Sequence, residues 1–267
     1  MRRFRRCAGS LSLALLLTLL PGVNPAAEKA SGQAPAVEKL ITGILLLDAV
    51  NVNGRLLVVG ERGRIFIRDA GTPWRLAQTP ASSATLTTVF MADEQTGWAA
   101  GHDAVILKTT DGGQSWREVY SDPEREAPIL DLWFADRDYG LAVGAYGLYL
   151  VTTNGGENWT DTGLRVVNAG EWEEPGADGL EPDDPHLNAI AADAAGHLYL
   201  AAEAGHLYHS EDSGQTWAAL PAPYHGSFFG VLPMAEDSLL AFGLRGHLRS
   251  EEHTSELQSH VRISYAV

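Results

Sequence analysis

Three short stretches of the chain repeat one arrangement of a hydroxyl residue, an acid or amide, a glycine and a tryptophan. They are TTDGGQSW (109–116), TTNGGENW (152–159) and SEDSGQTW (210–217). A fixed carboxyl group could act as a general acid or base, and a pair of them could hydrolyse a glycosidic bond. These acids are therefore the first candidates for chemistry, and their role depends on the elements that hold them.

Other reactive side chains are few. His197, His206 and His247 recur in the phrase GHL, but they fall in different strands or repeats without the close spacing of metal ligands. Cys7 is the only cysteine, so a mature chain without it has neither a disulfide nor a thiol nucleophile. We predict no metal site and no cofactor.

The beginning of the chain predicts export. Residues 1–27 combine four arginines, the apolar run LSLALLLTLL (11–20) and the small-residue stretch PGVNPAA, as a cleavable signal peptide does. The expected location is periplasmic or otherwise exported, with no direct membrane insertion after cleavage. The net charge is −15, which disfavours nucleic acid as a partner.

The end of the chain matches nothing upstream. Residues 249–267, RSEEHTSELQSHVRISYAV, resemble a translated sequencing adapter. We therefore exclude them from the fold prediction as a non-native tail and expect a truncated sequence. The predicted domain is 44–248, preceded by a segment (28–43) that is a linker or the start of the first repeat.

Internal repeats organise this domain. Five units align on the recurrent turn, at 44–74, 85–116, 129–159, 187–217 and 228–248. Each contains short runs rich in Val, Leu, Phe and Tyr, separated by Gly, Asp and Asn, which predict four antiparallel strands. A period of about 42 residues is typical of a β-propeller blade, whereas solenoid repeats are usually shorter. The predicted fold is all-β, a β-propeller with five blades present and six or seven in the natural protein, which we expect to be a monomer when full length.

The repeated turn resembles the Asp box of sialidases and other β-propellers. The matching residues are Asp69, Gly71 and Trp74; Thr109, Asp111, Gly113 and Trp116; Thr152, Asn154, Gly156 and Trp159; and Ser210, Asp212, Gly214 and Trp217. An aspartate or asparagine here accepts backbone N–H groups across the turn, glycine adopts a conformation that other residues resist, and tryptophan buries a large ring. We predict a structural clasp in each blade, not a catalytic group.

A sialidase-like glycoside hydrolase is the alternative function. Such enzymes carry an arginine triad, a tyrosine–glutamate pair, an acid aspartate and a Phe-Arg-Ile-Pro-like motif. That tetrapeptide is missing, because RIFIR (64–68) is a strand run. We predict a protein that is not an enzyme.

A second resemblance concerns whole repeats. VGERGRIFIRDAG, AGHDAVILKTTDGG and VGAYGLYLVTTNGG are similar to repeats of the photosystem II stability/assembly factor-like (BNR/Asp-box repeat) family. The resemblance covers 44–248 and implies a seven-bladed propeller that binds membrane-protein partners without catalysis. Bacterial members are exported, some encoded beside transporters. The degenerate first box, Asn154 and an acidic insertion in the fourth repeat depart from the pattern, so the partner does not transfer.

Strand alternation predicts where a partner binds. Because successive turns alternate between the two faces of a propeller, the second-to-third turns lie opposite the Asp boxes. These turns are predicted at Glu61–Arg62, His102–Asp103, Ala145–Tyr146, Glu203–Ala204 and Leu244–Arg245. The connections between blades share that face, among them the acidic segment 164–186, which either anchors a protein or is only a solvated loop. The candidate partner-binding residues are Arg62, His102, Asp103, Tyr146, Trp172, Glu173, Glu174 and Arg245.

The expected function is that of a protein-binding assembly or stability factor for a membrane or envelope protein complex. A transporter is one such complex.

Overall fold

The computed structural model describes residues 36–80, 84–167, 184–221, 226–234, 238–244, 248–251 and 264–265, the last two ranges as backbone. Strands dominate these residues, and they form five separate sheets. No helix within the described ranges is long and apolar enough to cross a membrane. The all-β prediction is confirmed.

The first three sheets each consist of four antiparallel strands in chain order. Their strands are β1 (Leu46–Val52), β2 (Arg55–Gly60), β3 (Ile65–Asp69) and β4 (Arg75–Leu76); β5 (Leu86–Met91), β6 (Gly97–Gly101), β7 (Ile106–Thr109) and β8 (Arg117–Tyr120); and β9 (Ile129–Phe134), β10 (Gly140–Gly144), β11 (Tyr149–Thr152) and β12 (Thr160–Asp161). These sheets are the predicted four-stranded blades.

The fourth sheet differs by one strand. It contains β14 (Leu187–Ala192), β15 (Leu198–Ala202), β16 (Leu207–Ser210) and β17 (Trp217–Leu220), and β13 (Val166–Val167) pairs with β17 in parallel. The fifth sheet contains β18 (Phe228–Pro233), β19 (Leu239–Gly243), β20 (Leu248–Glu251) and β21 (Ser264–Tyr265). In the backbone, β20 continues three residues past the predicted domain end at Leu248 and pairs with β19.

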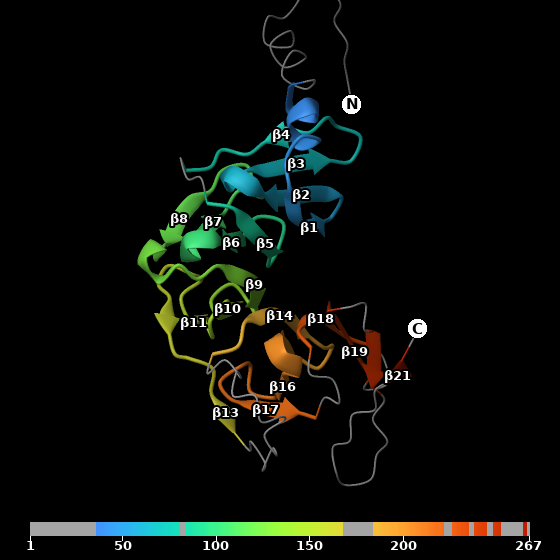
Figure 1. Ribbon diagram of the computed structural model, residues 1–267. Helices are drawn as coiled ribbons and strands as arrows, with labels where there is room; N and C mark the ends of the chain where they lie inside the picture. The colour runs from blue at the N-terminus through green and yellow to red at the C-terminus, as the bar shows by residue number, and fades with distance from the viewer. Residues whose placement is uncertain are drawn as a thin grey trace, which may run out of the picture.

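The five sheets follow one another in an arc (Figure 1). The first strand of each sheet (β1, β5, β9, β14 and β18) lies on the inner side of this arc and contacts the first strand of the next sheet. Outer strands such as β8 and β17 lie away from the arc's centre. This arrangement of successive blades is that of a β-propeller.

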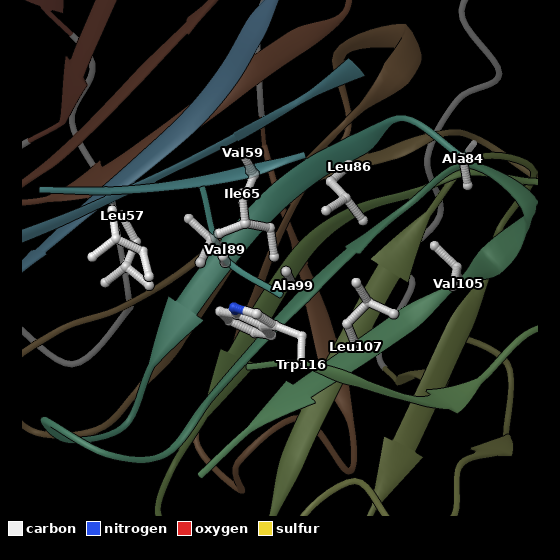
Figure 2. Close-up of a cluster of buried hydrophobic side chains, with 12 residues drawn as sticks. Leu57, Val59, Ile65, Ala84, Leu86, Val89, Ala99, Val105, Leu107 and Trp116 are labelled. Atoms are coloured by element: carbon white, nitrogen blue, oxygen red, sulfur yellow. The ribbon is translucent and has the colours of Figure 1, made fainter. Parts of the chain in front are cut away.

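The core lies between the blades. Leu57 and Val59 of β2 face the second blade, where they pack with Val89 and Trp116 in one buried cluster (Figure 2). Equivalent clusters fill the next two interfaces, each with a tryptophan of the following Asp box, Trp159 and Trp217. Because strand residues alternate between faces, one blade contributes to the clusters on both of its sides.

The two ends of the arc differ. Residues 36–41 are helical, and Ile41 packs with Val58 and Phe66 on the face of blade 1 that looks away from blade 2. On blade 5, Leu232 (53% exposed) and Phe242 (44% exposed) remain at the surface. The segment 28–43 was predicted only as a linker or the start of the first blade, so this helical cover is a feature that the sequence did not indicate.

Candidate functional site

The Asp box of blade 2 is a closed network of hydrogen bonds. The buried Thr109 hydroxyl accepts from the Gly113 N–H at 2.9 Å and donates to Asp111 Oδ1 at 2.9 Å. Asp111 in turn accepts from the Ser115 N–H at 2.9 Å and the Ser115 hydroxyl at 2.5 Å. Burial raises the pKa of Asp111, but these bonds outweigh it and the net pKa is lowered.

The boxes of blades 3 and 4 repeat this network. Ser210 and Asp212 form the same bonds as their counterparts in blade 2, with Thr216 as the donor that closes the turn. In blade 3, Asn154 offers one oxygen, which accepts from the Thr152 hydroxyl at 3.1 Å and the Asn158 N–H at 3.0 Å. An amide has only one acceptor oxygen, whereas a carboxylate has two. One oxygen is enough in blade 3, because Asn158 has no side-chain hydroxyl that would donate to a second oxygen as Ser115 does in blade 2. The residue at 158 therefore compensates for the presence of Asn instead of Asp at 154.

Blade 1 uses ion pairs in place of this network. Pro73 occupies the position of Ser115 and has neither an N–H nor a hydroxyl to donate. Asp69 instead pairs with Arg55 at 2.6 Å and Arg75 at 2.7 Å. The hydrogen bond from Arg55 lowers the pKa of Asp69, burial raises it, and the hydrogen bond from Arg75 lowers it again. The net effect is a lowered pKa. The degenerate box is still a clasp, held by side chains from other strands.

Each complete box also binds the preceding blade through its glycine carbonyls. Arg55 Nη1 donates to Gly112 O at 3.1 Å, Trp98 Nε1 to Gly155 O at 3.1 Å, and Tyr149 Oη to Gly214 O at 2.7 Å. The backbone of the box tryptophan adds a second link in two blades, where Trp116 and Trp217 donate to the segment leaving the previous blade. The box acids are thus engaged within the contact between neighbouring blades.

The opposite face is built from backbone. In blades 2, 3 and 4 the second-to-third turn closes with a bond from the fourth residue to the first, such as Leu148 N–H to Ala145 O at 3.1 Å. Its two central residues both have positive φ, as in a type I′ turn. In four blades these central pairs lie one residue later than predicted, at Arg62–Gly63, Asp103–Ala104, Tyr146–Gly147 and Ala204–Gly205.

A second repeated contact ties each turn to the segment that leads into the same blade. The first residue of the turn donates its N–H to a lead-in carbonyl at 2.9–3.1 Å in all five blades, for example Ala145 to Pro128 and Leu244 to Ser227. The residue before the turn is glycine in four blades, because a Cβ there would lie 2.0–2.3 Å from that carbonyl oxygen. We call the surface formed by these turns and lead-in segments the turn face. The Asp boxes and first-to-second turns form the Asp-box face.

The turn face displays side chains that differ between blades. Arg62, His102, Asp103 and Tyr146 are all exposed, and Tyr146 is 61% accessible. The Tyr146 ring meets His186 edge-on with centroids 4.8 Å apart, which links the turn of blade 3 to the lead-in of blade 4. The structure therefore places these four candidates on one face, on the turns of blades 1, 2 and 3. Trp172, Glu173, Glu174 and Arg245 lie outside the described residues.

The first-to-second turns contain a motif that the sequence interpretation missed. Asp93, Asp136 and Asp193 each accept two backbone N–H groups from the residues that follow them. The recurrent Ala-Asp pair at the end of the first strand was the available signal. Of the histidines in GHL phrases, His197 pairs with Asp193 at 2.9 Å. Among the described residues, no group of three or more His, Cys, Asp or Glu could hold a metal ion.

One pair of carboxyl groups lies together, on the inner strands. Asp48 accepts the N–H of Val89 at 2.8 Å, and Asp131 accepts the N–H of Ile190 at 2.9 Å, so each acid joins its own blade to the next. The Thr88 hydroxyl lies 3.2 Å from both carboxyl groups. Both acids therefore serve as joints between blades, which the sequence did not reveal because the partners are 40 or more residues apart.

The sialidase alternative called for a triad of arginines, and several of the described arginines are held in ion pairs. Five of them are bound to carboxylates that lie in different parts of the array. The pairs are Arg55 and Arg75 with Asp69, Arg117 with Glu157, Arg125 with Asp161, and Arg137 with Asp93.

Comparison with known proteins adds a family. Residues 66–249 match the model described as "Photosynthesis system II assembly factor YCF48". A search of curated proteins gives no match.

Solved structures share the fold at low identity. The structure described as "YCF48 bound to D1 peptide" is 18% identical with a TM-score of 0.58, over 78% of this chain and 65% of that one. YCF48 from Cyanidioschyzon merolae is 18% identical with a TM-score of 0.59, over 84% and 71%. An ancestral GH74 enzyme is 14% identical with a TM-score of 0.60, over 81% of this chain and 31% of the enzyme. This chain thus spans only about two thirds of the two YCF48 structures.

Proposed function

The chain belongs to the YCF48 photosystem II assembly factor family, and on that basis we propose that it is an exported, non-catalytic assembly or stability factor that binds a protein of a membrane or envelope complex. The observation that carries the proposal is the family match across 66–249, which includes most of the five blades. A solved member of this family is described as bound to a D1 peptide, which supports a polypeptide ligand.

The turn face is the surface that we assign to the partner. Its backbone is fixed five times by the same lead-in contact, while its side chains vary from blade to blade. A row of different side chains on rigid turns can recognise one partner specifically, and an exposed tyrosine such as Tyr146 is a frequent anchor in protein interfaces. The Asp-box face, in contrast, uses its polar groups to hold the blades together.

Export is proposed from residues 1–27 alone. A basic start followed by a short apolar run and small residues is the signal that directs a chain out of the cytoplasm. This location would place the propeller beside the outward-facing parts of membrane proteins.

The test compares the two faces. Purified wild-type protein, a turn-face variant (Arg62→Ala with Tyr146→Ala) and an Asp-box-face control (Gln114→Ala) would be cross-linked to isolated envelope membranes of the source cell. We expect one membrane protein to be enriched by the wild type and by the control, and its yield to fall at least about tenfold with the turn-face variant. Equal capture by all three proteins, or no enriched membrane protein, would contradict the proposal.

The glycoside hydrolase alternative is tested separately. It rests on the Asp boxes and on a fold shared with a GH74 enzyme at 14% identity. Hydrolysis of sialosides or β-glucans by the purified protein above a heat-inactivated control would overturn the non-catalytic proposal, whatever the outcome of the cross-linking.

A further inference from the structure

Asp48, Thr88 and Asp131 occupy the same position in three successive blades. Each lies just past an irregularity in the pairing of the first strand with the second, opposite Val59, Ala100 and Val143 respectively. Blades 4 and 5 have Ala189 and Gly230 at this position. The polar series therefore ends after blade 3.

The two contacts at Thr88 can both be full hydrogen bonds only when one of the carboxyl groups carries a proton. Thr88 Oγ1 is 3.2 Å from Asp48 Oδ2 and 3.2 Å from Asp131 Oδ1. A hydroxyl carries one hydrogen and two lone pairs, so it can donate to one carboxylate only. The second contact becomes a hydrogen bond when that carboxyl is protonated and donates to the threonine oxygen. We propose that Asp131 holds a proton that it donates to Thr88, which in turn donates to Asp48, and that this proton makes the contact between the inner strands of blades 1 to 3 responsive to pH.

The remaining bonds keep both acids in place. Asp48 also accepts the Ala49 N–H at 2.7 Å, and Asp131 also accepts the Leu132 N–H at 2.8 Å. Together with the bonds to Val89 and Ile190, these contacts stop either carboxyl from turning away from Thr88. When both acids are ionised, the two negative charges are held on either side of one hydroxyl.

No cation in the adjacent strands offsets these charges. The strands packed against β9 (β5, β6, β10 and β14) contain no charged or titratable residue. On β2, Arg55 is paired with Asp69, and the neighbouring turns contribute Glu61 and Arg62 of η1 (Glu61–Gly63) and His102 and Asp103 of η2 (His102–Ala104). Burial, with a further contribution from Asp48, raises the pKa of Asp131 to about 6.

The direction of the pH effect follows from that pKa. An aspartate in an unfolded chain has a pKa of about 3.9. Between about pH 4 and pH 6 the folded protein therefore keeps a proton that the unfolded chain has released. The contribution to stability is complete below that window and is lost as the pH rises through about 6.

The decisive experiment is a site-resolved titration. The side-chain carboxyl carbons of aspartate would be followed by NMR in the full chain, with the Asp131 signal assigned by its loss in Asp131→Asn. In the wild type we expect Asp131 to titrate near pH 6, and in Asp48→Asn we expect its midpoint to fall by about one unit or more, because the second charge has been removed. Thr88→Ser keeps the hydroxyl and should keep the wild-type midpoint.

Two results would overturn the proposal. A wild-type midpoint below about 4.5 would show that no proton is held. An unchanged midpoint in Asp48→Asn would show that burial alone acts on Asp131. The wild-type titration decides the first point even if a variant does not fold, since the signal can then be assigned through its neighbours.

Discussion

The two faces of this propeller solve the same problem of closing a turn in opposite ways. On the Asp-box face the side chains close the turn: the Thr109 hydroxyl and the Asp111 carboxylate bind the backbone and each other. On the turn face the backbone closes the turn, and the side chains of Asp103 and Tyr146 are left exposed.

The difference explains why one face is visible in the sequence and the other is not. Where a side chain makes the turn, only a few residue types can do so, and the motif recurs. Where the backbone makes it, any residue that tolerates positive φ can occupy the position, and Arg62, Asp103, Tyr146 and Ala204 all do. Holding a residue other than glycine there costs about 1–2 kcal/mol. The Asp-box face therefore carries a sequence motif that identifies the fold, whereas the residue types of the turn face can differ between proteins.

The largest expected difference between the faces is the loss of stability when an aromatic residue is replaced by alanine. Trp217 is fully buried between blades 3 and 4, and its Nε1 donates to Tyr149 Oη at 3.0 Å. Replacing it by Ala should lower the free energy of unfolding by about 3–5 kcal/mol through the cavity that is left. Tyr146→Ala, the matched change on the turn face, should change it by less than about 0.5 kcal/mol. Urea denaturation followed by circular dichroism measures both, and equal losses would remove the distinction between the faces.

The next effect concerns the hydroxyl that closes the box. Thr109→Val keeps the shape but leaves the buried Gly113 N–H without its acceptor. We expect a loss of about 1–3 kcal/mol in the free energy of unfolding. Thr109→Ser, which has the residue found at Ser210, should lose less than about 1 kcal/mol. If Val and Ser were equally tolerated, the hydroxyl network would not hold the turn.

A pair of reciprocal changes tests the backbone of each face. Gly214 on the Asp-box face has φ 83°, and a Cβ there would lie 2.5 Å from Leu141 Cδ1 and 2.6 Å from Tyr149 Oη. Gly214→Ala should therefore destabilise by more than about 1 kcal/mol. Ala204 on the turn face has φ 55°, so Ala204→Gly should relieve strain and be neutral or stabilising by up to about 1 kcal/mol. Thermal melting of the two variants should move in these opposite directions.

The smallest effect separates blade 1 from the other boxes. Asp69 is held by two arginines that are themselves partly exposed, so Asp69→Asn should cost no more than about 1 kcal/mol. Because the folded pKa of Asp69 is lowered, its contribution is present above about pH 4 and is lost as the pH falls below that value. Salt should reduce it as well, whereas the loss in Thr109→Val should not depend on salt. A salt-independent Asp69→Asn effect would show that the ion pairs are not the clasp.

Much of the fold could be predicted because its signals are local and repeated. Thr109, Asp111 and Trp116 lie within one turn, so their repeated spacing predicted the blade. The turns at Arg62 and Tyr146 were found within one residue because strand lengths fix them. The arginine clasp of Asp69, the helical cover at 36–41 and the carboxyl pair were not found, since their partners are distant in the chain or lack a repeated pattern.

By itself the sequence determined the blade, because a blade is formed by strands that follow one another along the chain and whose residue pattern repeats. Only the tertiary structure decided how blades meet. Tyr149 reaches Gly214, and Asp48 and Asp131 meet at Thr88, across separations of 40 residues or more. Such contacts depend on the angle and register between sheets, which no single stretch of sequence encodes.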